Sequence, residues 1–128
     1  MTEGIEAVTT TMMGLALDAA SLRQQAIAAN IANSETAGYI PMGVSFDARM
    51  TDMQRVLDGA RGQLDAVALD AMQPRLQPLT DMAGVPAKIL LDVEVANLAQ
   101  NAVQYQALVK GLSKHYAILS SAVSDGKK

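Results

Sequence analysis

Apolar residues near both ends of the chain recur at intervals of three and four residues, the spacing of one face of a long helix. In the N-terminal part this first stripe comprises Ile5, Val8, Met12, Leu15, Ala19, Leu22, Ala26 and Ala29. In the C-terminal part it comprises Leu91, Val95, Leu98, Ala102, Tyr105, Val109, Leu112, Tyr116, Leu119 and Val123. The spacing predicts helices over about 5–33 and 87–123, with Pro86 suited to a helix start and Gly126 to a helix end. We expect the two helices to pack as an antiparallel, coiled-coil-like hairpin.

Each predicted helix carries a second apolar stripe. At about 100° per residue, the two stripes of the N-terminal helix lie roughly 150° apart. The second stripe of the N-terminal helix comprises Met13, Leu17, Ala20, Ile27 and Ile31. That of the C-terminal helix comprises Ile89, Val93, Ala96, Val103 and Ala107. Because a two-helix hairpin buries only one face of each helix, the second stripe needs another partner, which is either the middle of the chain or a neighbouring chain.

We interpret the first stripe as the pairing surface within one chain and the second as a contact between subunits. The residues predicted to pair within the chain are Ile5, Val8, Met12, Leu15, Leu22, Leu91, Val95, Leu98, Tyr105, Val109, Leu112, Tyr116 and Leu119. The alternative is that the middle segment covers the second stripe.

The middle of the chain predicts little regular structure. The spacing from Phe46 onward favours a short helix over about 46–59, and the prolines and glycines that follow favour an irregular connecting segment over about 61–86. With aromatics at 3% and Ala and Leu abundant, the predicted fold class is all-α. We therefore expect one discontinuous axial core domain from 1–33 and 87–128, joined by a turn, short helix and connecting segment at 34–86.

Composition and charge exclude several classes of function. The net charge is −3 without a basic block, which argues against nucleic-acid binding, and the chain has no cysteine. The only histidine, His115, has no partners arranged for catalysis, and no cluster has the spacing of metal ligands, so we expect no enzyme activity, cofactor or metal. No apolar run is long enough for a membrane span. The first fifteen residues hold Glu3 and Glu6 but no Lys or Arg, so we expect no cleavable signal peptide.

The predicted N-terminal helix ends in a run of turn-forming residues. Asn33 is suited to the end of a helix, and Gly38 can adopt a positive φ without steric cost. Tyr39 follows as an aromatic anchor whose hydroxyl needs a hydrogen-bond partner. From these residues alone, the segment is a helix that stops sharply and turns.

The residues of this turn resemble the N-terminal signature of bacterial flagellar rod and hook proteins. The matching residues are Asn30, Ile31, Ala32, Asn33, Thr36, Gly38 and Tyr39. The run from Asp92 to Gln106 is similar to the terminal helix of the same proteins, and the short chain, which lacks a large inserted domain, looks most like the proximal rod members of the flagellar basal-body rod family.

The resemblance implies a structural subunit that assembles helically through its terminal helices for flagellar motility. It implies as partners other copies of the chain, neighbouring rod proteins, the rod-to-ring adaptor, the membrane ring and the flagellar type III export apparatus, with no nucleic acid and no membrane insertion. The implied location is the periplasmic rod of the basal body. A different interpretation of the residues is a small helical adaptor that binds a partner helix through an exposed apolar stripe.

Overall fold

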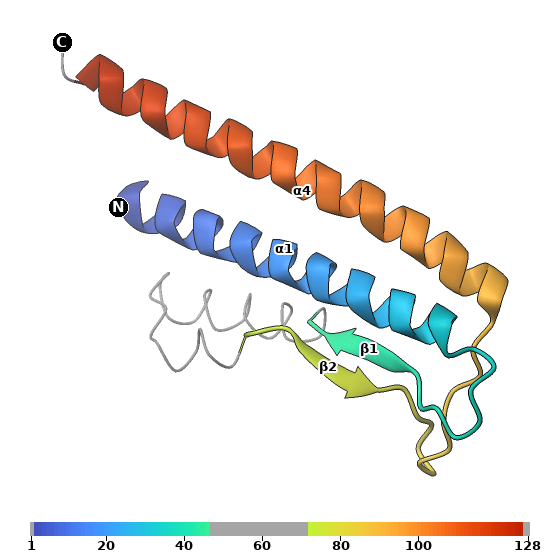
Figure 1. Ribbon diagram of the computed structural model, residues 1–128. Coiled ribbons are helices and arrows are strands. Elements are labelled where there is room, and N and C mark those ends of the chain that lie inside the picture. The colour runs from blue at the N-terminus through green and yellow to red at the C-terminus, as the bar shows by residue number, and fades with distance from the viewer. Residues whose placement is uncertain (1, 47–71, 127–128) are drawn as a thin grey trace.

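Two long helices dominate the computed structural model, which describes residues 2–46 and 72–126, with side chains from residue 9 onward in the first range. Helix α1 spans Thr2–Ala32 and helix α4 spans Leu91–Gly126. Figure 1 shows α4 running back alongside α1 in the opposite direction. The two predicted helices are thus confirmed as elements, and Gly126 is the last residue of α4 as predicted. No helix among the described residues is both long and apolar enough to span a membrane.

A two-stranded antiparallel sheet corrects the all-α prediction. Strand β1, Met42–Ser45, pairs with β2, Arg75–Pro78, with Val44 opposite Leu76. Two four-residue strands separated by about thirty residues leave no local pattern, so the sheet could not be found from periodicity. Pro78 has no backbone N–H to donate to the ladder. It is tolerated because it lies at the end of an edge strand.

The described part of the connecting segment is also ordered, contrary to the irregular segment predicted over 61–86. After β2, the Asp81 carboxylate accepts hydrogen bonds from the N–H groups of Ala83 and Val85, both at 2.9 Å. Gly84 completes this tight loop with φ near 80°. The short helix predicted over about 46–59 falls, apart from Phe46, outside the described residues.

The prediction that Pro86 suits the start of the C-terminal helix is wrong, because α4 begins five residues later, at Leu91. Pro86 is paired with Thr80 in an isolated antiparallel bridge, and the Ala87 N–H donates to the Leu79 carbonyl at 2.8 Å. The chain is therefore still extended at Pro86, and α4 begins at Leu91, where acidic residues in the first turn favour the positive end of the helix dipole.

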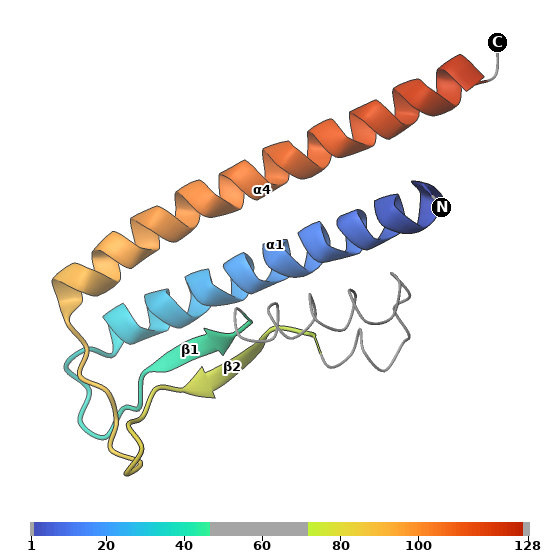
Figure 2. The same cartoon turned by 180° about the vertical axis from the view of Figure 1, so that it is seen from behind.

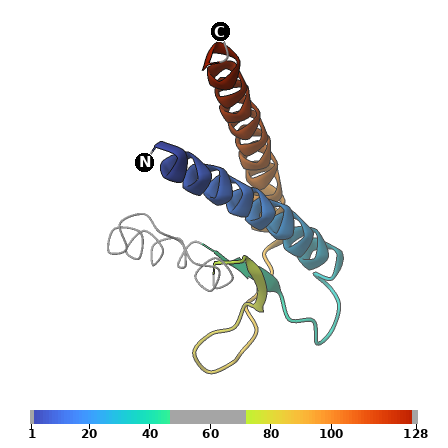
Figure 3. The ribbon, with the colours of Figure 1, turned by 90° about the vertical axis from the view of Figure 1, so that its left-hand side faces the viewer.

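The main elements form three layers, with α1 in the middle. Figures 1 and 2 show α4 on one side of α1 and the two strands on the other. The view in Figure 3 shows that α1 and α4 cross at an angle and diverge toward the chain termini. Consequently α1 is covered from two directions, whereas α4 meets the rest of the chain along one side only.

The buried apolar cluster lies between α1 and the sheet. Leu15 and Ala19 pack with Phe46 and Met72, and Val44 of β1 adds to the cluster. Met12 and Ala16 of α1 flank the same cluster. The core thus joins the N-terminal helix to the middle of the chain.

Candidate functional site

The turn after α1 is held by the side chains of the motif. The Asn33 Nδ2 donates to the Ala29 carbonyl at 2.9 Å, and the Thr36 hydroxyl lies 3.2 Å from Asn33 Oδ1. Gly38 has a φ of 78°, in the left-handed region that disfavours residues with a Cβ. The predictions for Asn33 and Gly38 are confirmed: the helix stops at Ala32 and the chain turns where the glycine permits it.

Asn30, in the last turn of α1, makes most of the side-chain hydrogen bonds that hold the following turn in place. Its side chain is 2% exposed, and its Oδ1 accepts hydrogen bonds from the Tyr39 hydroxyl at 3.0 Å and from the Met42 N–H at 2.9 Å. Its Nδ2 donates to the Met42 carbonyl at 2.9 Å and approaches Glu94 Oε2 at 3.5 Å. The four bonds use the full hydrogen-bonding capacity of the amide. One buried side chain therefore joins α1, the turn, β1 and the first turn of α4.

The bond from Tyr39 to Asn30 supplies the partner that the tyrosine hydroxyl was predicted to need. The bonds to Met42 were not predicted, although they satisfy both backbone groups of the first residue of β1. The unpaired edge of a strand is normally open to pairing with a further strand. At Met42 of β1 the Asn30 amide takes the place of such a strand, because it bonds to both backbone groups.

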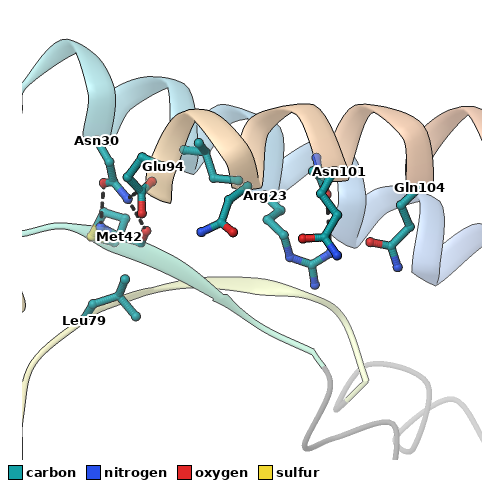
Figure 4. A pocket seen from close by; sticks show the side chains of 10 residues that line it. Arg23, Asn30, Met42, Leu79, Glu94, Asn101 and Gln104 are labelled. Atoms are coloured by element: carbon teal, nitrogen blue, oxygen red, sulfur yellow. Dashed lines mark hydrogen bonds between the residues drawn. The ribbon is translucent and has the colours of Figure 1, made fainter. Parts of the chain in front are cut away.

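A groove of about 380 Å³ lies between the helix pair and the segments at Met42 and Leu79. Figure 4 shows Asn30 and Glu94 at one end and Asn101 and Gln104 farther along. Carboxamides dominate the α4 wall, which is formed by Glu94, Asn97, Gln100, Asn101 and Gln104. The lining has no nucleophile with a neighbouring base, so it lacks the arrangement that covalent catalysis requires.

Metal-binding groups are also missing from the part of the chain that the structure describes, where no three His, Cys, Asp or Glu residues could hold an ion together. His115 lies partly buried on α4, and its Nε2 has no hydrogen-bond partner. Asp92 and Glu94 sit in the first turn of α4, where Glu94 contacts Asn30.

The two stripes of α1 have partners that differ from the predicted ones. Leu15 of the first stripe packs with Phe46 and Met72 on the sheet side, not on α4. Two residues of the second stripe meet α4 instead: Met13 lies beside Gly111, and the Ala20 carbonyl accepts a hydrogen bond from Asn101. The middle segment therefore covers a stripe of α1, but it covers the first stripe and not the second, as the alternative had it.

Two members of the predicted subunit-contact stripe are buried within the single chain. Ala20 has no exposed surface, and Ile27 is 6% exposed beside the groove. Leu17 and Ile31 are half-buried. Apolar pattern alone could not assign the stripes, because both offer the same kind of surface and distant parts of the chain decide which partner each one meets. Leu22 is half-buried, and Ile5 and Val8 lie outside the described side chains.

On α4, the residues predicted to pair within the chain divide into two groups. Leu98, Leu112 and Leu119 are half-buried on the side toward α1. The others remain exposed and form what we call the α4 exposed stripe: Leu91, Val95, Tyr105, Val109, Tyr116 and Val123.

The predicted second stripe of α4 is also largely exposed. Val93 and Val103 are exposed large apolar side chains, and Ala96 and Ala107 are exposed as well. Ile89 is half-buried but precedes the helix. Apolar surface of this extent on one helix is typical of a protein–protein contact.

Comparison with known proteins agrees with the motif. The model of a family described as "Flagella basal body rod protein" matches residues 14–39, the end of α1 and the turn centred on Asn30. The chain is also 28% identical over 123 residues to the flagellar basal body rod protein FlgB of Bacillus subtilis (strain 168), an alignment that covers 88% of this chain and 90% of that protein.

Both comparisons support the flagellar basal-body rod protein family as the family that this chain resembles. That family is structural, not enzymatic, and its proteins are part of the flagellar basal body. The matched segment coincides with the turn whose hydrogen bonds are described above, which gives the family signature a physical role in ending α1 and starting β1.

Proposed function

We propose that the chain is a subunit of the proximal rod and that it assembles helically by packing α4 against neighbouring subunits. The observation that carries this proposal is the α4 exposed stripe, in which Val95 is 51% and Tyr116 is 52% exposed in the isolated chain. A lone chain leaves this apolar surface in water, and contact with other chains would remove it.

The arrangement of surfaces supports open assembly over a closed pair. The α4 exposed stripe and the exposed part of the predicted second stripe, which includes Val93 and Val103, are two different surfaces of α4 that are available to different neighbours. Unlike surfaces that meet head to tail generate a filament when the rotation does not close. The proposed neighbours are copies of the chain, other rod proteins, the rod-to-ring adaptor and the membrane ring.

The proposal also includes the route and the location. The chain would leave the cell through the flagellar type III export apparatus and would be part of the rod in the periplasm. The absence of cysteine is compatible with this location, because no thiol is available for unwanted disulfides in an oxidising compartment.

The test is a double substitution in the α4 exposed stripe, Val95→Glu with Val109→Glu, in cells that lack the native chain. We expect the variant protein to be exported but missing from isolated basal bodies, with loss of motility. The matched control is Gln100→Glu with Ser121→Glu, which adds the same charge at exposed polar positions of α4 and should assemble normally.

Circular dichroism of the purified variants distinguishes loss of assembly from loss of folding. Both double variants should retain the helix content of the parent protein, because all four positions are exposed. Normal incorporation of the Val95→Glu, Val109→Glu variant would contradict the proposal. Its stable binding to one soluble partner instead of the rod would favour the adaptor alternative.

A further inference from the structure

Asn101 is the one residue of α4 that is buried, with 3% of its surface exposed, among the residues of that helix that the structure describes. Its Nδ2 donates to the Ala20 carbonyl at 2.8 Å and to Gln24 Oε1 at 2.9 Å. Its Oδ1 lies 3.4 Å from Arg23 Nη1. All three contacts are with a single turn of α1, so the amide specifies one position along that helix. Figure 4 shows Asn101 beside Arg23.

The apolar contacts of the pair specify that position only weakly. On α4, Leu98, Leu112 and Leu119 recur at multiples of seven residues, and on α1, Met13, Ala20 and Ile27 do the same. Sliding α4 by seven residues would therefore exchange one apolar side chain for another along most of the contact. Repeats of this kind are the reason that coiled coils need a polar residue to select one register.

A slide by seven residues would remove the hydrogen bonds of Asn101. The residues seven positions away are Glu94 and Leu108. Leucine cannot donate to Gln24 Oε1, and an ionised glutamate has no hydrogen to donate to that oxygen or to the Ala20 carbonyl. Among the observed register and the two reached by a slide of seven residues, only the observed one places a side chain with two N–H donors at this turn of α1.

Contacts elsewhere on the pair have the same register as Asn101. Arg23 contacts Asn101, and Asn30 contacts Glu94. The second pair lies seven residues farther along α1 and seven residues back along α4, as one antiparallel register requires. Met13 Cε lies 3.2 Å from the position of a Cβ on Gly111, ten residues from Arg23 and Asn101 respectively. Because Met13 Cε is the end of a flexible side chain, this contact adjusts easily and selects the register less strongly than the amide does.

We infer that Asn101 determines the register of α4 on α1, and thereby which apolar side chains of α4 stay exposed. The amide is a positioning residue: it touches no partner of the chain but decides how the surface of α4 is presented. The inference concerns pairing within one chain and does not depend on assembly into a rod.

Distance measurement in the isolated full-length chain tests this inference. Because the chain has no cysteine, Gln25→Cys and Ser121→Cys provide two unique sites for spin labels, both at exposed positions. The sites lie far apart along the pair, so a slide by seven residues changes their separation by about 10 Å at ~1.5 Å per residue. The parent should give one distance.

The variants are Asn101→Leu, which removes all three contacts, and Asn101→Asp, which keeps the size of the side chain but removes both donors. We expect each variant to show a second population displaced by about 10 Å, with the ratio of native to displaced register reduced by about tenfold or more, since each bond contributes measurably to the choice. Gln24→Leu, which removes one partner on α1, should give a smaller reduction.

The matched control is Asn97→Leu, at an exposed asparagine one turn away on α4, which should keep the single distance. Two results would overturn the inference: a single native distance in both Asn101 variants, or the loss of all helix pairing in both, which would make Asn101 a residue of stability and not of register. Failure of rod assembly with a native distance would instead concern the function proposed above.

Discussion

The two long helices are covered to different degrees by their own chain. Helix α1 has the Leu15 cluster on the sheet side and α4 on the other side, so the chain itself covers two of its faces. Helix α4 has α1 along one side and exposes large apolar side chains along much of its length, including Val103 at 67% and Val123 at 60%. The difference separates two kinds of hydrophobic surface: one that the fold requires and one that is left for partners.

The largest effect should come from placing a charge on each surface in turn. Leu15→Asp should lower the free energy of unfolding by more than about 4 kcal/mol, because an unpaired carboxylate would be buried in the apolar cluster. Val103→Asp should change it by no more than about 0.5 kcal/mol, because that position is already exposed. Urea unfolding of the purified chain, followed by circular dichroism, measures both.

A large loss of stability in Val103→Asp would contradict the comparison. It would mean that the side of α4 that carries Val103 is covered in the isolated chain and is therefore not a surface available for assembly. Similar stability of Leu15→Asp and the parent protein would contradict the other half, in which the sheet side of α1 is a true core.

The next largest effect concerns the amide at the end of α1. Asn30→Ala should lower the free energy of unfolding by about 3 kcal/mol, because it removes the Asn30 partner of both backbone groups of Met42 and of the Tyr39 hydroxyl. Asn97→Ala, at an exposed asparagine on the same groove, should stay within about 0.5 kcal/mol of the parent. An equal effect of the two substitutions would show that burial of the Asn30 amide contributes nothing.

The smallest effects should differ in sign between two glycines of the same region. Gly14 lies inside α1 with nothing within 4 Å of an added Cβ, so Gly14→Ala should stabilise the chain by about 0.5–1 kcal/mol. Gly38 has a positive φ in the turn, so Gly38→Ala should destabilise it by about 1 kcal/mol despite equally open space. The shift of the urea midpoint measures both, and shifts of the same sign would contradict the backbone argument.

Local features of this chain were predictable from sequence because their causes are local. The heptad spacing gave the two helices, and the turn chemistry of Asn33, Gly38 and Tyr39 gave the end of α1. The start of α4 was misplaced because Pro86 suits a helix start equally well in an extended segment, and only its bridge to Thr80 decides between them.

Contacts between distant segments were not predictable in the same way. The pairing of Val44 with Leu76 and the packing of Leu15 on Phe46 depend on where the chain returns after the turn, which no local pattern encodes. Asn30 and Asn101 show the one sequence signal for such contacts, which is an amide close to the apolar faces of a long helix. Each of the two is buried with its hydrogen bonds satisfied.

The most direct test of the central claim compares the reactivity of single cysteines in the free chain and in isolated basal bodies. Val109→Cys should react readily with a maleimide in the purified chain and become protected in the assembled rod, whereas Leu15→Cys should be protected in both. This outcome would show that other subunits cover α4 while the chain itself covers α1. Equal reactivity of Val109→Cys in the free and assembled protein would contradict the account.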